Sequence, residues 1–272
     1  MNGAAQIYPI LSDILGDRST LIPDPTFGEY SRVFNVTDTY ADLGEYDYSL
    51  VESKFEKASN IVIVNPNNPT GSILKTTWIL EMVVKYPQKL FIVDESFIEF
   101  SDQPSIIDSL EIRSRDNVIV IRSMSKTYGL PGVRLGFVYT CDKKLNVKIA
   151  EKIPIWNMNS VSEFFMEIIV KNKLALKNSI VQTKSDRKQF SELLRDIPAV
   201  EEVYNSHANF ILFKVNEKLK QNKLSEFLIQ EHSIYIKDVS NKFNSKENSH
   251  FRVAVRDIND NNLLIEVLKN IQ

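Results

Sequence analysis

Apolar residues cluster in short, nearly continuous runs in the first half of the chain. Three runs rich in β-branched residues cover 61–64, 90–93 and 118–121. Such runs are typical of strands buried on both faces, as in a parallel sheet. The intervening segments 46–58 and 72–86 carry apolar residues at helical spacing. Strands that alternate with helices of this length predict a mostly parallel, three-layer α/β domain.

A turn of small residues near the start runs directly into a helical pattern. Gly3, Ala4 and Ala5 precede apolar positions at helical spacing over 7–15. A turn that feeds a helix N-terminus exposes backbone N–H groups and suits an anion, although a simple N-cap turn gives the same pattern. The other elements expected in this half are a proline-rich loop and two strands: 23–30, 32–36 and 133–139.

The segment 153–160 separates this pattern from a different one. We therefore expect a large domain over 1–155 and a smaller C-terminal α+β domain over 156–272. The second domain should open with a long, kinked amphipathic helix over 161–197. Its further strands and helices are expected at 203–204, 209–215, 224–231, 234–236, 251–256 and 261–271.

Composition is that of an ordinary globular protein and disfavours several classes of function. Hydrophobic residues make up 43% and charged residues 25% of the 272 positions. The net charge is −2 and the basic residues are scattered, which argues against a nucleic-acid partner. No apolar run approaches the roughly 20 residues that span a bilayer, and the first residues lack the basic region of a signal peptide.

The cysteine and histidine content disfavours an internal disulfide and a metal site. A single cysteine, Cys141, rules out an internal disulfide and fits a reducing compartment, so we expect a cytoplasmic protein that is not bound to a membrane. The three histidines show no metal-ligand spacing, so we expect no metal site.

One lysine lies where chemistry is expected. Lys126 follows the buried run 118–121 and should lie in a loop at the strand's end, a place that charged side chains normally avoid. A lysine that loses its proton easily can form a Schiff base with an aldehyde. Ser123, Ser125 and Arg134 around it could hold a phosphate, and an aldehyde beside a phosphate describes pyridoxal 5'-phosphate (PLP). Taken alone the motif is weak, and a surface lysine fits it as well.

Two other strands end in polar residues. The segment Asn-Pro-Asn-Asn-Pro-Thr-Gly at 65–71 combines a fixed turn with amides that can donate to a ligand. Asp94 ends the run 90–93, where a carboxylate can pair with a protonated pyridine nitrogen. Open α/β sheets bind ligands at this edge. The alternatives are a plain turn and a surface acid, and Glu99 is expected to be solvated.

The last candidates could bind anions or a ring. Arg252 and Arg256 alternate with apolar residues, so both should point to one face of a strand. Arginines on a buried face bind anions, whereas an exposed edge strand would explain them equally. Lys237 is open to the same two interpretations. Phe27, in the proline-rich loop, could belong to the core or stack on a flat ring.

Together these blocks resemble a known family. Asn2-Gly3-Ala4, 65–71, 94–100 and 123–137 occur in this order, with 251–256 behind them. The set resembles the fold-type I PLP enzymes of the class I/II aminotransferase superfamily, in the branch of histidinol-phosphate aminotransferases and threonine-phosphate decarboxylases. The resemblance covers essentially the whole chain. It implies a PLP-transferase large domain, a smaller C-terminal domain and a homodimer.

The resemblance implies a role for each cofactor residue. Lys126 would be the Schiff-base lysine and proton carrier, Asp94 would pair with the pyridinium nitrogen, and Asn68 would donate to the ring's phenolic oxygen. Phe27 would stack on the ring. The cofactor phosphate would be held by the backbone amides of Ala4 and Ala5 and by Ser123, Ser125 and Arg134. The substrate's anionic group would be held by Arg252, Lys237 and Arg256.

Two departures from the family pattern affect the expected reaction. The family's aminotransferases usually carry tyrosine where this chain has Phe97, and the phospho-amino-acid decarboxylases tend to carry phenylalanine. We therefore expect decarboxylation of an O-phospho amino acid such as phosphoserine or phosphothreonine, with a histidinol-phosphate type aminotransferase as the alternative. The family also has several tens of residues before Asn2-Gly3-Ala4, so a truncated PLP-binding protein without activity is a second alternative. A Rossmann nucleotide-binding protein is disfavoured because no G-x-G-x-x-G follows the first strand.

Overall fold

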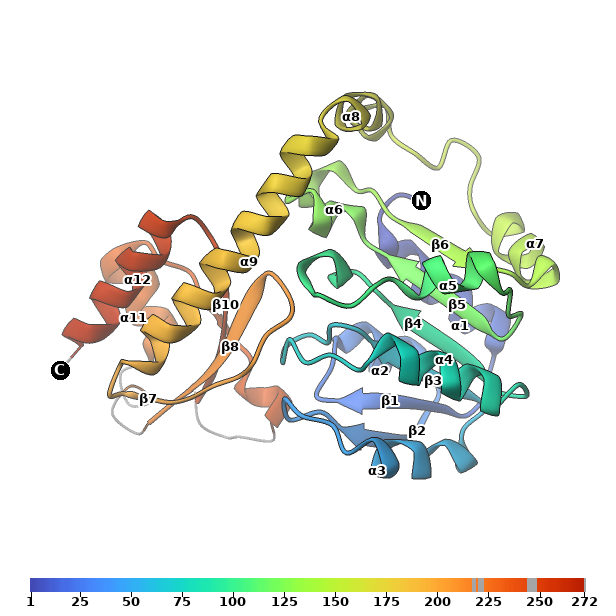
Figure 1. Cartoon of the computed structure of the whole chain (residues 1–272), viewed down its shortest axis with the longest axis horizontal. Helices are drawn as coiled ribbons and strands as arrows, with labels where there is room; N and C mark the ends of the chain where they lie inside the picture. The colour runs from blue at the N-terminus through green and yellow to red at the C-terminus, as the bar shows by residue number, and fades with distance from the viewer. Residues whose placement is uncertain (217–218, 220–222, 244–248, 272) are drawn as a thin grey trace.

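Two sheets organise the molecule. The computed structural model describes residues 1–216, 219, 223–243 and 249–271. Within these residues the larger sheet has six strands in the order β2-β1-β3-β4-β5-β6, all parallel except β6, which runs antiparallel to β5 (Figure 1). The mostly parallel α/β prediction is therefore confirmed. The strands are β1 Thr20–Asp24, β2 Val36–Ala41, β3 Asn60–Val64, β4 Leu90–Asp94, β5 Val118–Arg122 and β6 Phe137–Thr140.

Helices cover both faces of this sheet because its central strands are apolar on both sides. Ile61 and Ile63 pack with α3, α4 and α5, whereas Val62 and Val64 face α1, α2 and α7. Each such fully buried side chain stabilises the fold by about 1.5–3 kcal/mol. The helices are α1 Ile7–Leu15, α2 Gly28–Val33, α3 Tyr48–Ser53, α4 Thr76–Lys85, α5 Ile106–Ile112, α6 Met124–Thr127 and α7 Lys143–Glu151.

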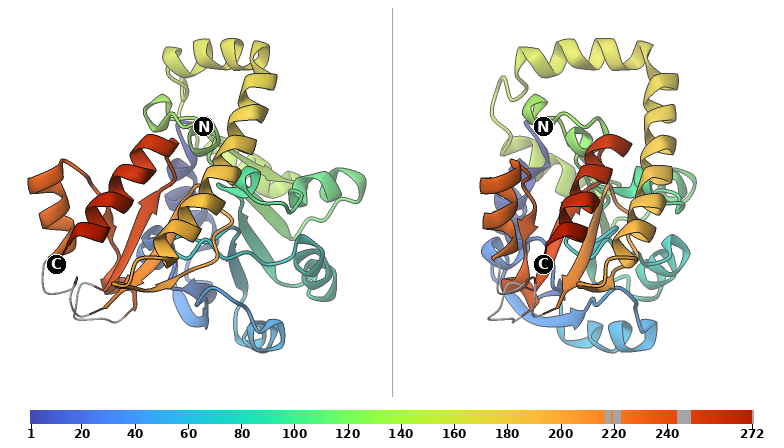
Figure 2. Two further views of the ribbon diagram at one scale, coloured as in Figure 1. Left: turned by 60° about the vertical axis from the view of Figure 1, so that its left-hand side comes forward. Right: turned by 90° about the vertical axis from the view of Figure 1, so that its left-hand side faces the viewer.

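The second half is built on a smaller antiparallel sheet, in the order β7-β8-β10-β9 within the described residues. Helices α9, α11 and α12 pack on it through one apolar cluster. The predicted helix 161–197 is two helices, which Figure 2 shows at a wide angle to each other, because the helical run is interrupted at Asn172. The elements are α8 Ser160–Lys171, α9 Lys173–Arg195, β7 Val200–Val203, β8 Phe210–Val215, α11 Leu224–His232, β9 Lys237–Asp238, β10 His250–Ala254 and α12 Ile258–Asn270.

Helix α9 ties the two halves together. The Arg187 guanidinium donates from Nη1 to the carbonyl oxygens of Phe100 (2.8 Å) and Ala208 (2.7 Å), which come from different halves. The expected division into 1–155 and 156–272 stays a prediction, with the large sheet before it and the small sheet after it.

Several local predictions were wrong. The segment 32–36 is not a strand: Tyr30 and Phe34 lie one helical turn apart and are both buried against α1, so 28–33 is helical and β2 follows. Strand β1 was missed because it is short and contains Pro23. Residues 131–133 form a 3-10 turn, so β6 begins later than predicted, and β9 likewise follows the predicted 234–236.

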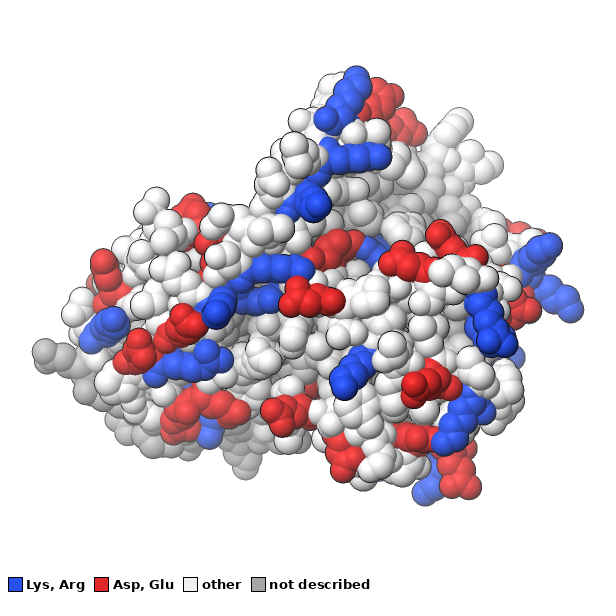
Figure 3. All heavy atoms as spheres, viewed as in Figure 1, with Lys and Arg blue, Asp and Glu red and all other residues white. Residues whose placement is uncertain are grey.

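The surface carries no concentrated charge on the face in Figure 3, where basic and acidic side chains are interspersed. In the part of the chain that the structure describes, no helix combines the length and apolar character needed to cross a membrane. Among the same residues, no group of three histidine, cysteine or acidic side chains is placed to hold a metal ion.

Candidate active site

A cavity of about 520 Å³ lies where the carboxyl ends of β3, β4 and β5 meet the small sheet. The topology explains its place, since parallel strands end at one edge and the loops there carry the polar residues of the sequence motifs. Most of the predicted site residues line it: Ala4, Ala5, Phe27, Asn68, Asp94, Ser123, Lys126, Arg134, Lys237 and Arg252.

Two predicted residues do not line the cavity. The Ser125 hydroxyl is buried and bonded to the backbone of Leu135, whose N–H donates to it at 2.9 Å. Arg256 lies beyond the end of β10 at Ala254, so it does not share a strand face with Arg252. Its guanidinium instead pairs with Asp260 on the exposed side of α12.

Asp94 is buried at the end of β4 and accepts hydrogen bonds from protein groups on both carboxylate oxygens. The hydroxyls of Tyr8 (2.9 Å) and Tyr30 (2.8 Å) both donate to Oδ2. The backbone N–H (2.9 Å) and hydroxyl (2.5 Å) of Ser96 donate to Oδ1. These bonds fix the orientation of the carboxylate in a place where an unpaired charge would be costly.

Lys126 lies in the short helix α6, not in a loop as predicted, and its side chain is exposed to the cavity. The surrounding walls desolvate its amine, which lowers the pKa of Lys126, and the nearby charges of Arg252 and Arg134 lower it further. A depressed pKa increases the neutral fraction, the form that attacks an aldehyde.

Arg134 and the backbone around Gly3 and Ala4 form another wall of the cavity. Gly3 has a φ of 81°, and a Cβ there would lie 2.4 Å from an Arg134 guanidinium nitrogen. A Cβ on Gly136 would lie 2.5 Å from the backbone nitrogen of Ala4. The two glycines therefore let Arg134 and the start of the helical run Ala4–Gln6 approach closely, beside Ser123.

A buried carboxylate holds the loop that carries Asn68. Asp42 is fully buried and accepts hydrogen bonds from Tyr46 (2.6 Å), Thr70 (3.0 Å) and the amide of Asn67. Asn67 in turn accepts the Asn68 backbone N–H at 2.8 Å. This explains why the segment 65–71 carries so many polar side chains, since Asn65, Asn67 and Thr70 each contribute a bond that fixes the loop.

The small sheet supplies the remaining wall. The Arg252 guanidinium donates to Oδ1 of Asn68 and lies 5.1 Å from the ring centroid of Phe210. Phe210 also packs edge-on against Phe97, with centroids 5.1 Å apart. Lys237 on β9 lines the same side. Arg252 is thus pre-positioned over an aromatic face, where a planar guanidinium suits a carboxylate or phosphate.

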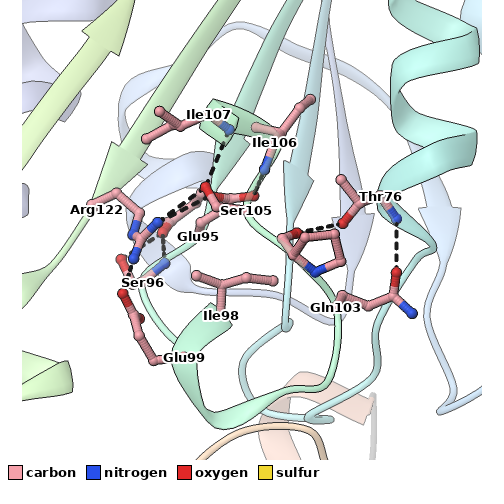
Figure 4. A network of polar contacts seen from close by, with 12 residues as sticks. Thr76, Glu95, Ser96, Ile98, Glu99, Gln103, Ser105, Ile106, Ile107 and Arg122 are labelled. Carbon is pink, nitrogen blue, oxygen red and sulfur yellow. Dashed lines mark hydrogen bonds and ion pairs between the residues drawn. The ribbon is translucent and has the colours of Figure 1, made fainter. Parts of the chain in front are cut away.

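Glu99 is not solvated as predicted. It pairs with Arg122, which also reaches Glu95 at 3.3 Å (Figure 4). Glu95 accepts the backbone N–H of Ile106 at 2.8 Å. Glu99 also accepts the Thr127 hydroxyl at 3.0 Å, so this network holds the turn on both sides of Lys126.

Sequence reasoning missed other residues of the site. Ser96 could have been found, because an Asp-x-Ser spacing is typical of a carboxylate bonded to the backbone two residues on. Tyr8 and Tyr30 gave no such signal, since both occupy apolar helical positions that pattern alone assigns to the core. Asn209 and Tyr235 also line the cavity and follow no motif.

The donor set fits PLP. Lys126 offers an amine for an aldehyde, Asp94 a fixed carboxylate for a pyridine nitrogen, and Arg134 a cation beside backbone N–H groups for a phosphate. Phe27, half-buried at the N-cap of α2, offers an aromatic face in the same cavity.

The chain matches the family described as Aminotransferase class I and II over residues 1–268. It belongs to that family. The family consists of PLP-dependent enzymes, so the resemblance seen in the sequence motifs is confirmed.

Both decarboxylases and aminotransferases are similar to the chain. It is 28% identical to L-serine phosphate decarboxylase of Sulfurospirillum multivorans over 99% of this chain and 72% of that protein. Some other curated relatives are much longer, and the chain spans less than half of their length. The solved histidinol-phosphate aminotransferase from Clostridium acetobutylicum superposes with a TM-score of 0.87 at 28% identity, covering 99% of this chain and 82% of that one. L-threonine-O-3-phosphate decarboxylase from Porphyromonas gingivalis gives 0.85 at 25% identity, covering 99% and 81%.

Proposed function

We propose that this chain is a PLP-dependent enzyme that decarboxylates an O-phospho amino acid of the phosphoserine or phosphothreonine type. One observation carries the proposal: the described residues that line the cavity include four basic side chains and a single carboxylate, Asp94. Arg134 is placed for the cofactor phosphate, which leaves Arg252 and Lys237 for a second anionic ligand. A substrate with both a carboxylate and a phosphate suits this charge.

The residues divide the work. When bound, PLP supplies an electron sink for the pair released at the substrate's α-carbon. Lys126 Nζ would hold the cofactor aldehyde and move protons at that carbon, while Asp94 would pair with the ring nitrogen. Asn68 would donate its amide to the phenolic oxygen. Arg252 would orient the substrate, and this orientation would decide which bond at the α-carbon breaks.

Phe97 favours decarboxylation over transamination. It lines the cavity three residues after Asp94 and brings no hydroxyl to the ring. The named relatives support both a decarboxylase and an aminotransferase. A histidinol-phosphate type aminotransferase is therefore the alternative, and a PLP-binding chain without activity is the second.

Product analysis tests the proposal directly. The purified chain is incubated with PLP and either phosphoserine or phosphothreonine, and carbon dioxide and the phosphorylated amine are measured. We expect both products in equal amounts. Glutamate formed from 2-oxoglutarate when histidinol phosphate is the amino donor would favour the aminotransferase, and a visible cofactor band without any product would favour the inactive alternative.

Replacing Phe97 by tyrosine should change the balance of the reaction. The new hydroxyl can donate to the cofactor's phenolic oxygen, so we expect a shifted visible absorption band and a several-fold larger share of transamination. Phe100→Tyr is the control, because Phe100 belongs to the same aromatic cluster but does not line the cavity. An F97Y chain with the parent's spectrum and product ratio would remove the reason for preferring decarboxylation.

We further propose a cytoplasmic homodimer. Apolar side chains are strongly exposed around α8, including Trp156 (95%), Phe164 (64%) and Leu174 (71%). Exposed large apolar side chains in one region of the chain are typical of a protein–protein contact. Sedimentation equilibrium should give twice the chain mass of 31.3 kDa, and a monomer at micromolar concentration would contradict the dimer.

A further inference from the structure

The acceptor sites of Asp94 are fully used by protein donors. A carboxylate offers about four lone-pair sites, two on each oxygen. Tyr8 and Tyr30 use Oδ2, while the N–H and hydroxyl of Ser96 use Oδ1. A pyridine N–H that reaches Asp94 is a fifth donor, so one of the existing hydrogen bonds has to give way.

The two oxygens of Asp94 differ in how their donors can leave. On Oδ1 the Ser96 hydroxyl, which also lines the cavity, can rotate away, but the Ser96 backbone N–H cannot leave without moving the turn. On Oδ2 both donors are phenol hydroxyls. Tyr30 is fully buried and does not line the cavity. Tyr8 lines the cavity and donates to the same oxygen as Tyr30. Tyr8, although only 3% exposed, is thus the tyrosine donor to Oδ2 that borders the space a ring would enter.

Tyr8 is also built to be a hydrogen-bond donor. Burial, followed by the negative charge of Asp94, raises the pKa of Tyr8 far above its ordinary value, so the hydroxyl keeps its proton at neutral pH. Its ring packs edge-on to Tyr30 at 5.2 Å and lies 5.9 Å from Phe27. These ring contacts hold the hydroxyl in place and do not depend on it.

We propose that the Tyr8 hydroxyl competes with the cofactor's ring nitrogen for Oδ2 of Asp94, so that Tyr8 weakens PLP binding. The inference rests on the proposed function, in which Asp94 pairs with that nitrogen. Tyr8 is then a positioning residue: it keeps a buried carboxylate oriented and hydrogen-bonded whenever the ring nitrogen is not there. The consequence is a cofactor that exchanges more readily.

The test compares two variants that each remove one phenol hydroxyl from the same oxygen. The dissociation constant for PLP is measured from the visible band of the lysine-bound cofactor, for the parent, Tyr8→Phe and Tyr30→Phe chains stripped of cofactor. We expect about tenfold tighter binding for Tyr8→Phe, the equivalent of one hydrogen bond. Tyr30→Phe should bind no tighter than the parent, because its hydroxyl does not face the cavity.

A cofactor analogue with C–H in place of the ring nitrogen sharpens the test, since it cannot donate a hydrogen bond to Asp94. Its affinity should not rise in Tyr8→Phe. Tyr8→Met is measured beside Tyr8→Phe, and thermal melts show that both chains fold. If the parent binds PLP covalently and neither Tyr8 variant binds it more tightly, or if the analogue gains equally, the inference is wrong and the proposed function stands. If the parent never attaches PLP, the proposed function fails and this inference with it.

Discussion

A chain in which Lys126 is replaced by alanine should carry no covalently attached PLP and should lose turnover by about 10³-fold or more. The reason is positional: Lys126, in α6 just after β5, brings its amine to the cavity that Asp94 and Arg134 also line. Borohydride reduction followed by peptide mass spectrometry measures the attachment. The parent should yield a modified peptide that contains Lys126, and the variant should yield none.

Lys237→Ala is the matched control, because Lys237 also lines the cavity but lies on the small sheet. It should keep the covalent cofactor and lose substrate affinity instead, seen as a raised KM. Reducible, lysine-linked cofactor in the Lys126→Ala chain would show that another lysine is the attachment site and would overturn the assignment.

Lys126→Ala should also change stability, and this change separates a loss of activity from a loss of the fold. Desolvation lowers the pKa of Lys126 from its ordinary 10.5, so the unfolded chain binds this proton more tightly than the folded chain. Stability should therefore rise with pH between the lowered pKa and 10.5 because of this group. Lys126→Ala removes that part of the slope and should melt no lower than the parent near neutral pH, which shows that lost activity is not lost fold.

The large sheet was predictable because its central strands are buried on both faces. Such strands must be apolar throughout, so β3, β4 and β5 appear in the sequence as continuous runs. Strand β2 could not be found the same way, since it lies at the edge of the sheet and its middle residues 37–39 are all polar. The kink expected within 161–197 is the break between α8 and α9, but its position at Asn172 could not be predicted because apolar spacing continues across it.

The site was predictable where a motif follows a buried strand. Asp94 ends β4 and Asn68 lies in the loop that follows β3, and the parallel topology alone brings them together. Ser125 and Arg256 could not be told apart from true site residues on the sequence alone. The hydroxyl of Ser125 is used within its own turn, and Arg256 lies two residues past the end of its strand. Neither of these two features can be seen in the pattern of residues along the chain. Tyr8 is the converse case, because its polar role depends on contacts that span 86 residues.

The second large effect should come from Arg122. Replacing it with methionine leaves Glu95, which is 1% exposed, with no cation beside it. Breaking a buried ion pair on one side costs about 3–5 kcal/mol. Chemical denaturation at pH 7 should show a loss of this size. Arg32→Met is the matched control: the Arg32 side chain is 64% exposed and that of its partner Glu29 is 29% exposed, so water screens this pair and the loss should stay below about 1 kcal/mol.

The pH dependence of the Arg122→Met chain distinguishes a lost charge pair from lost packing. Burial raises the pKa of Glu95, and Arg122 opposes this shift. Without Arg122 the pKa rises further, so the folded chain binds more protons than the unfolded chain over a wider range. The variant's loss of stability relative to the parent should then grow as pH rises above the ordinary glutamate pKa and shrink as pH falls towards it.

Adding Glu95→Gln to Arg122→Met should restore part of the stability and flatten this slope. A deficit that is constant with pH would mean that Arg122 acts through its packing. In that case the turn around Lys126 is held by shape and by the Thr127–Glu99 hydrogen bond, not by charge.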